Sequence, residues 1–349
     1  MQKDFHYCLI KVLTQTSGFS TEDAQIIAYA SQYADDAVEH LPLLIKNLPD
    51  LGFKERVKGE YFDPICTAHQ GIQYITGLLK DVQRKVYIPF HFLPSLKYEG
   101  QGSYNYCCIP DGNLAQVLIQ QAADKMNTAK KEKRTRKLIQ LGLALHTYAD
   151  NWSHQRFSGR RSARDNDVER IHIFKDNNYE PLPFFDQLKL NIIPDVGHAE
   201  TLNYPDQSHL KWKYEHDASG FEYARDNTAI FLEAARTIFN TLCKANNQPG
   251  NWKALVNKIK ACFSVPSDSI KEKFQKYQEL FPEITFDYNE DEWRNQALKG
   301  ESFDWINFEE EDYNAQTYEF NGDMKWFYFH MAAYEQRHFA IKNTRKDLL

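Results

Sequence analysis

The sequence lacks the features that would place it in several large functional classes. It has no apolar run of about 18 residues, so it offers no candidate for a membrane-spanning helix. The net charge of −6 over 349 residues argues against a nucleic-acid binder that relies on a broad basic face. The six cysteines show no CxxC spacing, which argues against a thiolate zinc site. No P-loop, GxGxxG, GxSxG or HExxH motif is present.

The start of the chain carries no recognisable export signal. Residues 1–6 include no secretory h-region. We therefore expect a cytoplasmic protein, or a secreted effector that is exported by a route that leaves no such signal. In a chain this long, six cysteines are expected to be reduced and buried rather than to form a disulfide framework.

Helical patterning dominates the sequence, and no repeat or composition break marks a linker. We expect helices at residues 6–17, from Ser20 onward, and at 70–80, 113–126, 132–154, 218–245, 250–263, 268–280 and 323–341. The intervening segments 81–110, 155–215 and 282–322 are expected to be irregular, with β-leaning residues at 86–90 and an acidic, aromatic loop region at 282–322. The predicted fold class is mainly α, a single domain over residues 1–349 with long irregular loops and little β.

A series of metal-binding residue types lies in the predicted helix at 132–154. His146, Asp150 and His154 follow one another at intervals of four residues, after an apolar run without proline. Because a helix has about 3.6 residues per turn, such steps keep the side chains on one face. Polar groups in an apolar helix are costly unless something compensates them. A His–Asp hydrogen bond is the structural alternative, but the second histidine favours a metal cluster in which the aspartate bridges two ions.

Other candidate ligands are scattered along the chain. Asp35 and Asp36 end an apolar stripe, where negative charge opposes the helix dipole and indicates a bound cation, or else a solvated helix end. The remaining candidates are His6 near the chain start, His69 where a loop enters a helix, His91 between two prolines, His198 on a loop, and Asp206 and His209 shortly after it. For His91, a satisfied core histidine is the alternative.

Four segments together resemble a known superfamily. They are residues 4–7 (DFHY), 30–36 (ASQYADD), 89–94 (PFHFLP) and 145–154 (LHTYADNWSH). In ligand types and order they resemble the zinc-dependent phospholipase C and P1-type nuclease superfamily. They are most similar to a bacterial and fungal branch that includes zinc metallophospholipases C acting on phosphatidylcholine. The resemblance spans roughly residues 4 to 215, and the segment from His146 to His154 is its most specific part.

The resemblance implies a multi-helix bundle of the phospholipase C/P1 nuclease type with up to three zinc ions. Asp150 would bridge two ions, one completed by His146, His69 and either Asp35 or Asp36, the other by His6 and terminal backbone groups; His154 and His198 would hold the third. His91 stays open as the alternative to His69. The superfamily's HxxxE motif is missing at His198, because Glu200 is only two residues on. The third ion then needs Asp206, His209, Glu215 or a water.

The activity that the resemblance implies is hydrolysis of phosphatidylcholine-type phospholipids to diacylglycerol and phosphocholine. Asp35 or Asp36 would act as general base and Asp150 would hold the metal cluster. The implied partners are a phospholipid and, transiently, a membrane surface, without nucleic acid. Two alternatives remain: another phosphoesterase of the superfamily, such as a nuclease or phosphomonoesterase, and a non-catalytic helical interaction protein that keeps part of the metal site.

Overall fold

A computed structural model describes residues 1–68, 79–95, 106–127, 133–183, 196–216, 220–266, 269–300, 303–304 and 316–344. The helices are η1 (Asp4–Leu9), α1 (Ile10–Thr16), α2 (Thr21–Asp36), α4 (Lys80–Val82), η2 (Gln83–Tyr87), α5 (Ile88–Phe90), α6 (Asn113–Asn127), α7 (Arg134–Ser153), α8 (Ala163–Asn166), η4 (Ala199–Thr201), η5 (Tyr204–Asp206), α10 (Asn227–Ala245), α11 (Trp252–Phe263), α12 (Ile270–Leu280), α13 (Glu292–Ala297) and α15 (Lys325–Asn343). The strands are β1 (Leu43–Lys46), β2 (Val57–Lys58), β3 (Tyr61–Phe62), β4 (Val168–Lys175), β5 (Asn178–Pro181), β6 (Lys211–His216), β7 (Phe221–Asp226), β8 (Leu298–Lys299) and β9 (Thr317–Phe320).

Most helices with a clear apolar period are confirmed close to their predicted ends. These are η1 with α1, α2, α6, α7, α11, α12 and α15. Helix α2 begins after Ser20, as the sequence predicts. Ser20 is its N-cap, and the Ser20 hydroxyl accepts a hydrogen bond from the Asp23 backbone N–H at 3.1 Å. It ends at Asp36, so Asp35 and Asp36 do lie at a helix C-terminus. No helix in the described ranges is both long and apolar enough to cross a membrane.

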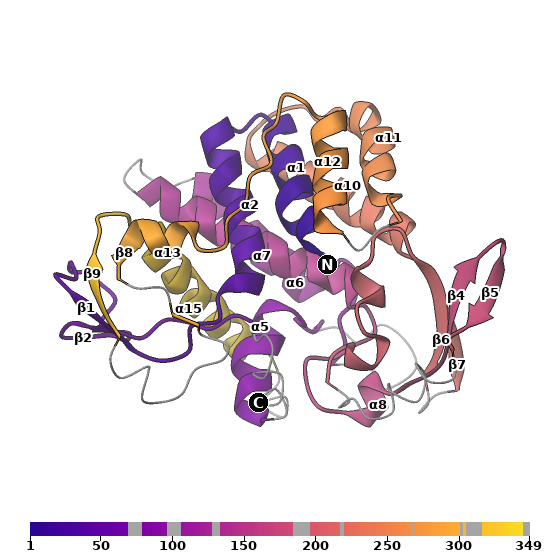
Figure 1. Cartoon of the computed structure of the whole chain (residues 1–349), viewed down its shortest axis with the longest axis horizontal. Coiled ribbons are helices and arrows are strands. Elements are labelled where there is room, and N and C mark those ends of the chain that lie inside the picture. Colours follow the sequence, from indigo (N-terminus) through magenta and orange to yellow (C-terminus); the bar gives the residue numbers. More distant parts are fainter. Residues whose placement is uncertain are drawn as a thin grey trace.

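Helices α2 and α7 form the centre of the molecule and carry the candidate site. Nearly all of α7 is buried, from Leu138 to Ser153, and it runs through the middle of the helices that surround it (Figure 1). The two helices touch at Gly142, where an added Cβ would lie 2.3 Å from the Ile27 carbonyl oxygen and 2.7 Å from the Ala30 Cβ. Glycine therefore permits the close approach that brings the end of α2 beside α7.

We expect Gly142→Ala to destabilise the protein by about 1–3 kcal/mol, although alanine is the better helix former. The new methyl group would meet the Ile27 backbone, which can move only together with α2. Denaturant unfolding of the metal-free variant and the wild type measures this difference. A variant at least as stable as the wild type would show that the two helices do not approach so closely.

The expectation of little β structure is wrong. The described residues contain a five-stranded sheet in the order β2-β3-β1-β9-β8 and a four-stranded sheet in the order β5-β4-β6-β7. The fold is therefore mixed α/β, with the two sheets at opposite sides of the helices (Figure 1). In the first sheet, β1 pairs in parallel with β9, so Leu44 lies opposite Thr317. Such short strands, paired across most of the chain, leave little local periodicity in the sequence.

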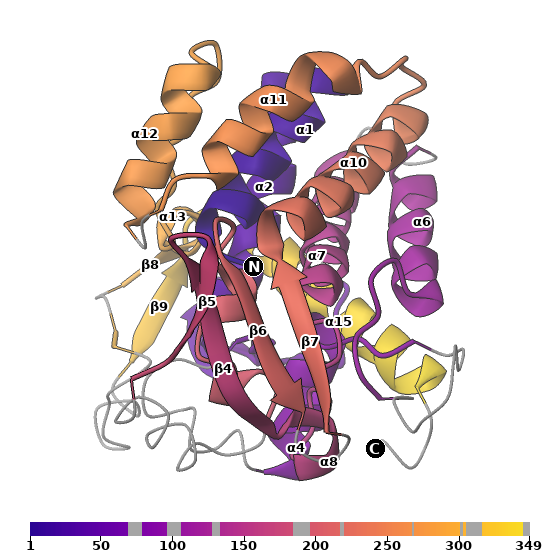
Figure 2. The ribbon, with the colours of Figure 1, turned by 90° about the vertical axis from the view of Figure 1, so that its right-hand side faces the viewer.

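Three strands of the second sheet begin in the segment 155–215, which was predicted to be irregular. Its strands lie side by side beneath α10 and α11 in Figure 2. Their inner side chains, including Trp212 and Tyr214, form a small core with Phe92 and Phe157. The helix predicted at 218–245 begins only at Asn227, because the preceding residues form β7 and Asp226 caps the helix by accepting the Ala229 N–H.

Three further segments differ from the prediction or cannot be compared with it. The β-leaning residues 86–90 are helical and continue from α4 through η2 into α5. The predicted helix at 70–80 lies almost entirely outside the described residues. The acidic, aromatic region at 282–322 contributes α13, β8 and β9 in its described part.

Candidate metal centre

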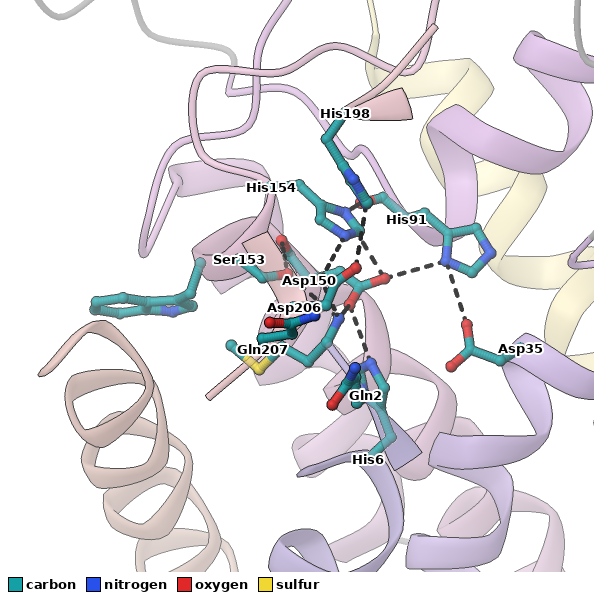
Figure 3. Close-up of polar contacts among 12 residues, drawn as sticks. Gln2, His6, Asp35, His91, Asp150, Ser153, His154, His198, Asp206 and Gln207 are labelled. Atoms are coloured by element: carbon teal, nitrogen blue, oxygen red, sulfur yellow. Dashed lines mark hydrogen bonds and ion pairs between the residues drawn. The ribbon is translucent and has the colours of Figure 1, made fainter. Parts of the chain in front are cut away.

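Helix α7 brings its three candidate ligands to one place, as their spacing predicts. His146 and Asp150 lie in the last two turns and are almost completely buried. His154 caps the helix, and its backbone N–H donates to the Asp150 carbonyl at 2.7 Å. The His146 Nε2 lies 3.2 Å from Asp150 Oδ2, and the side chains of Asp150 and His154 point into a space that residues from other elements complete (Figure 3).

Asp150 stands at the centre of this space, and its two oxygens face different partners. Oδ1 lies 3.0 Å from the Nε2 of His6. Oδ2 lies 3.1 Å from the Nδ1 of His91 and 3.2 Å from the Nε2 of His146. A carboxylate whose two oxygens face different imidazole rings has the arrangement that a bridging ligand needs.

Two groups of potential ligands share α7 residues. The first is His6, His146 and Asp150, and the second is Asp35, His91 and His146. His6 comes from η1, a buried π-helical turn, which is an element often found at functional sites. Asp35 comes from the C-terminus of α2, and its Oδ1 lies 3.6 Å from the His146 Nε2 and 3.8 Å from the His91 Nδ1.

The neighbouring Asp36 belongs to neither group. Its Oδ2 accepts hydrogen bonds from the Tyr288 hydroxyl at 2.6 Å and from the Gln32 side-chain amide at 3.1 Å. Burial raises the pKa of Asp36 to about 6. The choice between the two acids, which the sequence left open, therefore falls on Asp35 as the one that faces the other ligands.

A third group lies on the other side of Asp150 and consists of His154, His198 and Asp206. Asp206 Oδ1 lies 3.2 Å from the His154 Nε2, and Asp206 Oδ2 lies 3.2 Å from the His198 Nε2. Glu200, the acid closest to His198 in sequence, instead accepts the backbone N–H of Val168 at 2.8 Å. Two short 3-10 turns, η4 and η5, bring Asp206 beside both histidines.

Backbone carbonyls fix how three of the histidines are turned. The Nε2 of His91 donates to Thr67 O at 2.8 Å, and the Nδ1 of His154 donates to His91 O at 2.9 Å. The Nδ1 of His198 donates to Leu202 O at 2.7 Å. A carbonyl only accepts, so each ring carries a proton on that nitrogen and, when neutral, a lone pair on the other. These lone pairs face Asp150 and Asp206.

The pKa shifts of the surrounding groups differ in direction. Burial alone would lower the pKa of His91, but its hydrogen bond to Asp150 and the charges of Asp150 and Asp35 raise it. Burial, followed by the neighbouring His146, lowers the pKa of His6 to about 4. Burial likewise lowers the pKa of His154 below its usual value. Burial alone would raise the pKa of Asp150, but the Met1 amine and the surrounding histidines hold it well below its usual range. When His154 is neutral, its Nε2 lone pair therefore faces Asp206 at 3.2 Å without a proton between them, and a cation at this place would remove the repulsion.

The Met1 amine lies between the first and third groups. Its nitrogen is 2.5 Å from Asp150 Oδ1 and 3.0 Å from Asp206 Oδ1. Burial alone would lower the pKa of this amine, but the carboxylates of Asp150, Asp206 and Asp35 raise it to about 11. The amine and the His6 Nε2 thus approach the same carboxylate oxygen.

The other predicted ligands have separate positions. His69 lies outside the described residues, so His91 is the histidine that the structure places beside Asp35. Glu215 pairs with Arg170 on the four-stranded sheet, and His209 belongs to none of the three groups. Sequence reasoning missed the orienting carbonyls of Thr67 and Leu202, because backbone groups leave no mark in residue type.

Comparison with known proteins gives the relationship of the chain but no activity. A protein-family profile described as a family of unknown function (DUF6765) matches residues 1–344. The chain belongs to this family. No curated protein and no solved structure matches it. The matched residues include every member of the three ligand groups.

Proposed function

We propose that the protein is a zinc-dependent phosphodiesterase of the phospholipase C type, which hydrolyses phosphatidylcholine-type phospholipids to diacylglycerol and phosphocholine. One observation carries the metal part of this proposal: three His/Asp groups adjoin one another around Asp150 and Asp206, with imidazole lone pairs turned toward carboxylates. The choice of a phosphocholine lipid rests on the resemblance of residues 4–215 to the zinc metallophospholipases C.

The donor set fits zinc better than the other common ions. Each group combines imidazole nitrogen with carboxylate oxygen, which zinc prefers, whereas calcium and magnesium favour oxygen alone. All six cysteines are free thiols and none belongs to a group. Three of the histidine rings donate their other N–H to a backbone carbonyl, as metal-binding histidines commonly do. The groups would hold up to three ions, and Asp150 would serve two of them.

Phosphoester hydrolysis suits such a centre because adjacent zinc ions neutralise phosphoryl oxygens and lower the pKa of water. The chain supplies the remaining functions. The side chains of His6 and His146 are fully buried, whereas that of Asp35 is 32% exposed. Asp35 can therefore meet a substrate from solvent, orient the attacking water and accept its proton as general base. His198 and Asp206, 18% and 15% exposed, form the other accessible edge.

Hydrolysis of a chromogenic phosphocholine ester tests this proposal. We expect release of the chromophore to stop when a chelator is added and to return when zinc is restored. Parallel assays with a chromogenic phosphomonoester and with single-stranded DNA distinguish a phospholipase C from a phosphatase or a nuclease. The net charge of −6 makes DNA the least favoured substrate.

Two outcomes would contradict the proposal in different ways. Hydrolysis that is indifferent to chelator would show that the His/Asp groups do not support the reaction. If the protein bound zinc but hydrolysed none of the phosphoesters, the metal centre would be supported and the enzymatic role would be contradicted. The protein would then be a non-catalytic interaction protein.

A further inference from the structure

Leu202 has a backbone conformation that residues with a side chain rarely adopt. Its φ is 52° and its ψ is −129°, and Asn203 follows with φ −98° and ψ 10°. These angles match the central positions of a type II′ turn, in which the first position is normally glycine. The Leu202 side chain is 44% exposed, so its own burial compensates little of the backbone strain.

The strained peptide makes a contact with the third ligand group. The Leu202 carbonyl accepts the Nδ1–H of His198 at 2.7 Å. The Leu202 N–H donates to Ala199 O at 3.0 Å, which closes the preceding 3-10 turn η4. With Nδ1 occupied in this way, the Nε2 of His198 faces Asp206 Oδ2 at 3.2 Å (Figure 3).

The other end of the same loop is also specialised. Gly197, immediately before His198, has a φ of 60°, and an added Cβ would lie 2.5 Å from the Phe92 ring. That ring stacks on His154, with centroids 4.5 Å apart. His198 therefore lies between two constrained positions. On one side, Gly197 packs against the Phe92 ring that stacks on His154, and on the other side is the strained backbone of Leu202.

We propose that Leu202 is a positioning residue of the third metal group. Its left-handed backbone directs the carbonyl to the Nδ1 of His198, selects the Nδ1–H tautomer, and presents the Nε2 lone pair to a zinc ion shared with His154 and Asp206. The strain is retained because a relaxed peptide would turn this carbonyl away from the ring. The inference rests on the metal centre of the proposed function and does not depend on the substrate.

Three substitutions at this position separate the backbone from the side chain. Proline fixes φ near about −65° and removes the N–H, so Leu202→Pro cannot form the turn. Valine keeps the N–H but is strongly disfavoured at positive φ. Glycine adopts the conformation without strain. Leu79→Val is the matched control, because Leu79 is 59% exposed and has ordinary extended angles.

The measurement is the zinc content of each full-length chain after equilibration with a graded series of chelator concentrations. We expect Leu202→Pro to bind one ion about 10–100-fold more weakly, as for other lost second-shell partners, and to keep the remaining ions. Leu202→Val should fall between proline and wild type. Leu202→Gly and Leu79→Val should bind every ion as tightly as the wild type. Without metal, Leu202→Gly should melt about 1–2 °C higher, because the strain is gone.

Nitrogen-15 spectra of labelled histidine provide a readout that a general loss of stability would not change. We expect the Nδ1–H tautomer of His198 in the wild type and Leu202→Gly, and its loss in Leu202→Pro. If the proline variant does not fold, the valine variant decides, and tight binding of all ions by that variant overturns the proposal. So does weak binding by the glycine variant, because the side chain would then matter. A wild type with a full zinc complement but no phosphoesterase activity contradicts only the proposed function.

Discussion

Asp150→Asn is expected to release more than one zinc ion from the protein. Asp150 Oδ1 adjoins His6, whereas Oδ2 adjoins His91 and His146, so one carboxylate serves two ligand groups. The amide keeps the size of the side chain but removes its charge and turns one oxygen into a donor. Zinc analysis of the purified variant should find at least two ions fewer than in the wild type. Phosphoester hydrolysis should fall by on the order of 10³-fold or more, as when a principal electrostatic group is removed from an active site.

Asp36→Asn is the matched control for this substitution. Asp36 lies next to a ligand in sequence, but its carboxylate is bound by Tyr288 and Gln32 rather than by the histidines. We expect this variant to keep its full zinc content. If Asp150→Asn lost only one ion or none, Asp150 would not bridge. If Asp36→Asn lost an ion, the assignment of Asp35 as the α2 ligand would be wrong.

Lys273→Met is expected to destabilise the protein by about 3–5 kcal/mol, because it leaves a buried carboxylate without its charged partner. Lys273 lies on α12 and is fully buried, with its Nζ 3.7 Å from Asp4 Oδ1, and it also donates to the Gln2 side chain. Among the described residues, Asp4 Oδ2 has no hydrogen-bond partner, and burial raises the pKa of Asp4. Because Gln2 and Asp4 lie between Met1 and His6 in the sequence, the variant should also bind zinc less tightly.

Two further variants make the Lys273 prediction specific. Lys276→Met lies one turn further along α12, where Lys276 pairs with Glu279 at the surface, and should change stability by less than about 1 kcal/mol. Adding Asp4→Asn to Lys273→Met removes the uncompensated charge and should restore much of the loss. Denaturant unfolding of the four proteins measures these differences. Equal stability of Lys273→Met and Lys276→Met would mean that the buried pair is not formed.

Features encoded within a few residues could be predicted from the sequence. The spacing of His146, Asp150 and His154 predicted one helix face, and the side chains do meet there. The Ser20 cap and the apolar stripe of α2 predicted a helix that ends near Asp35 and Asp36. Each of these depends on periodicity or capping, which act over one or two turns.

Features that depend on distant parts of the chain could not be predicted. The pairing of β1 with β9 joins Leu44 to Thr317, and no local pattern encodes it. The sequence left Asp206, His209 and Glu215 open as partners of the third group, and the tertiary structure brings Asp206 to His154 and His198. The preference for Asp35 over Asp36 follows from Tyr288, far along the chain. Ligand type was therefore readable from the sequence, whereas the choice between neighbouring candidates required the tertiary contacts.

The zinc content of the purified wild-type chain, measured by elemental mass spectrometry after expression in zinc-containing medium, tests the central claim most directly. The three ligand groups predict about three zinc ions per chain, and at least two, since Asp150 belongs to one group and also contacts His91 of a second. Removal by a strong chelator should lower the melting temperature, because bound ions stabilise only the folded state. A folded protein with one ion or none would contradict the multinuclear centre and the hydrolytic function built upon it.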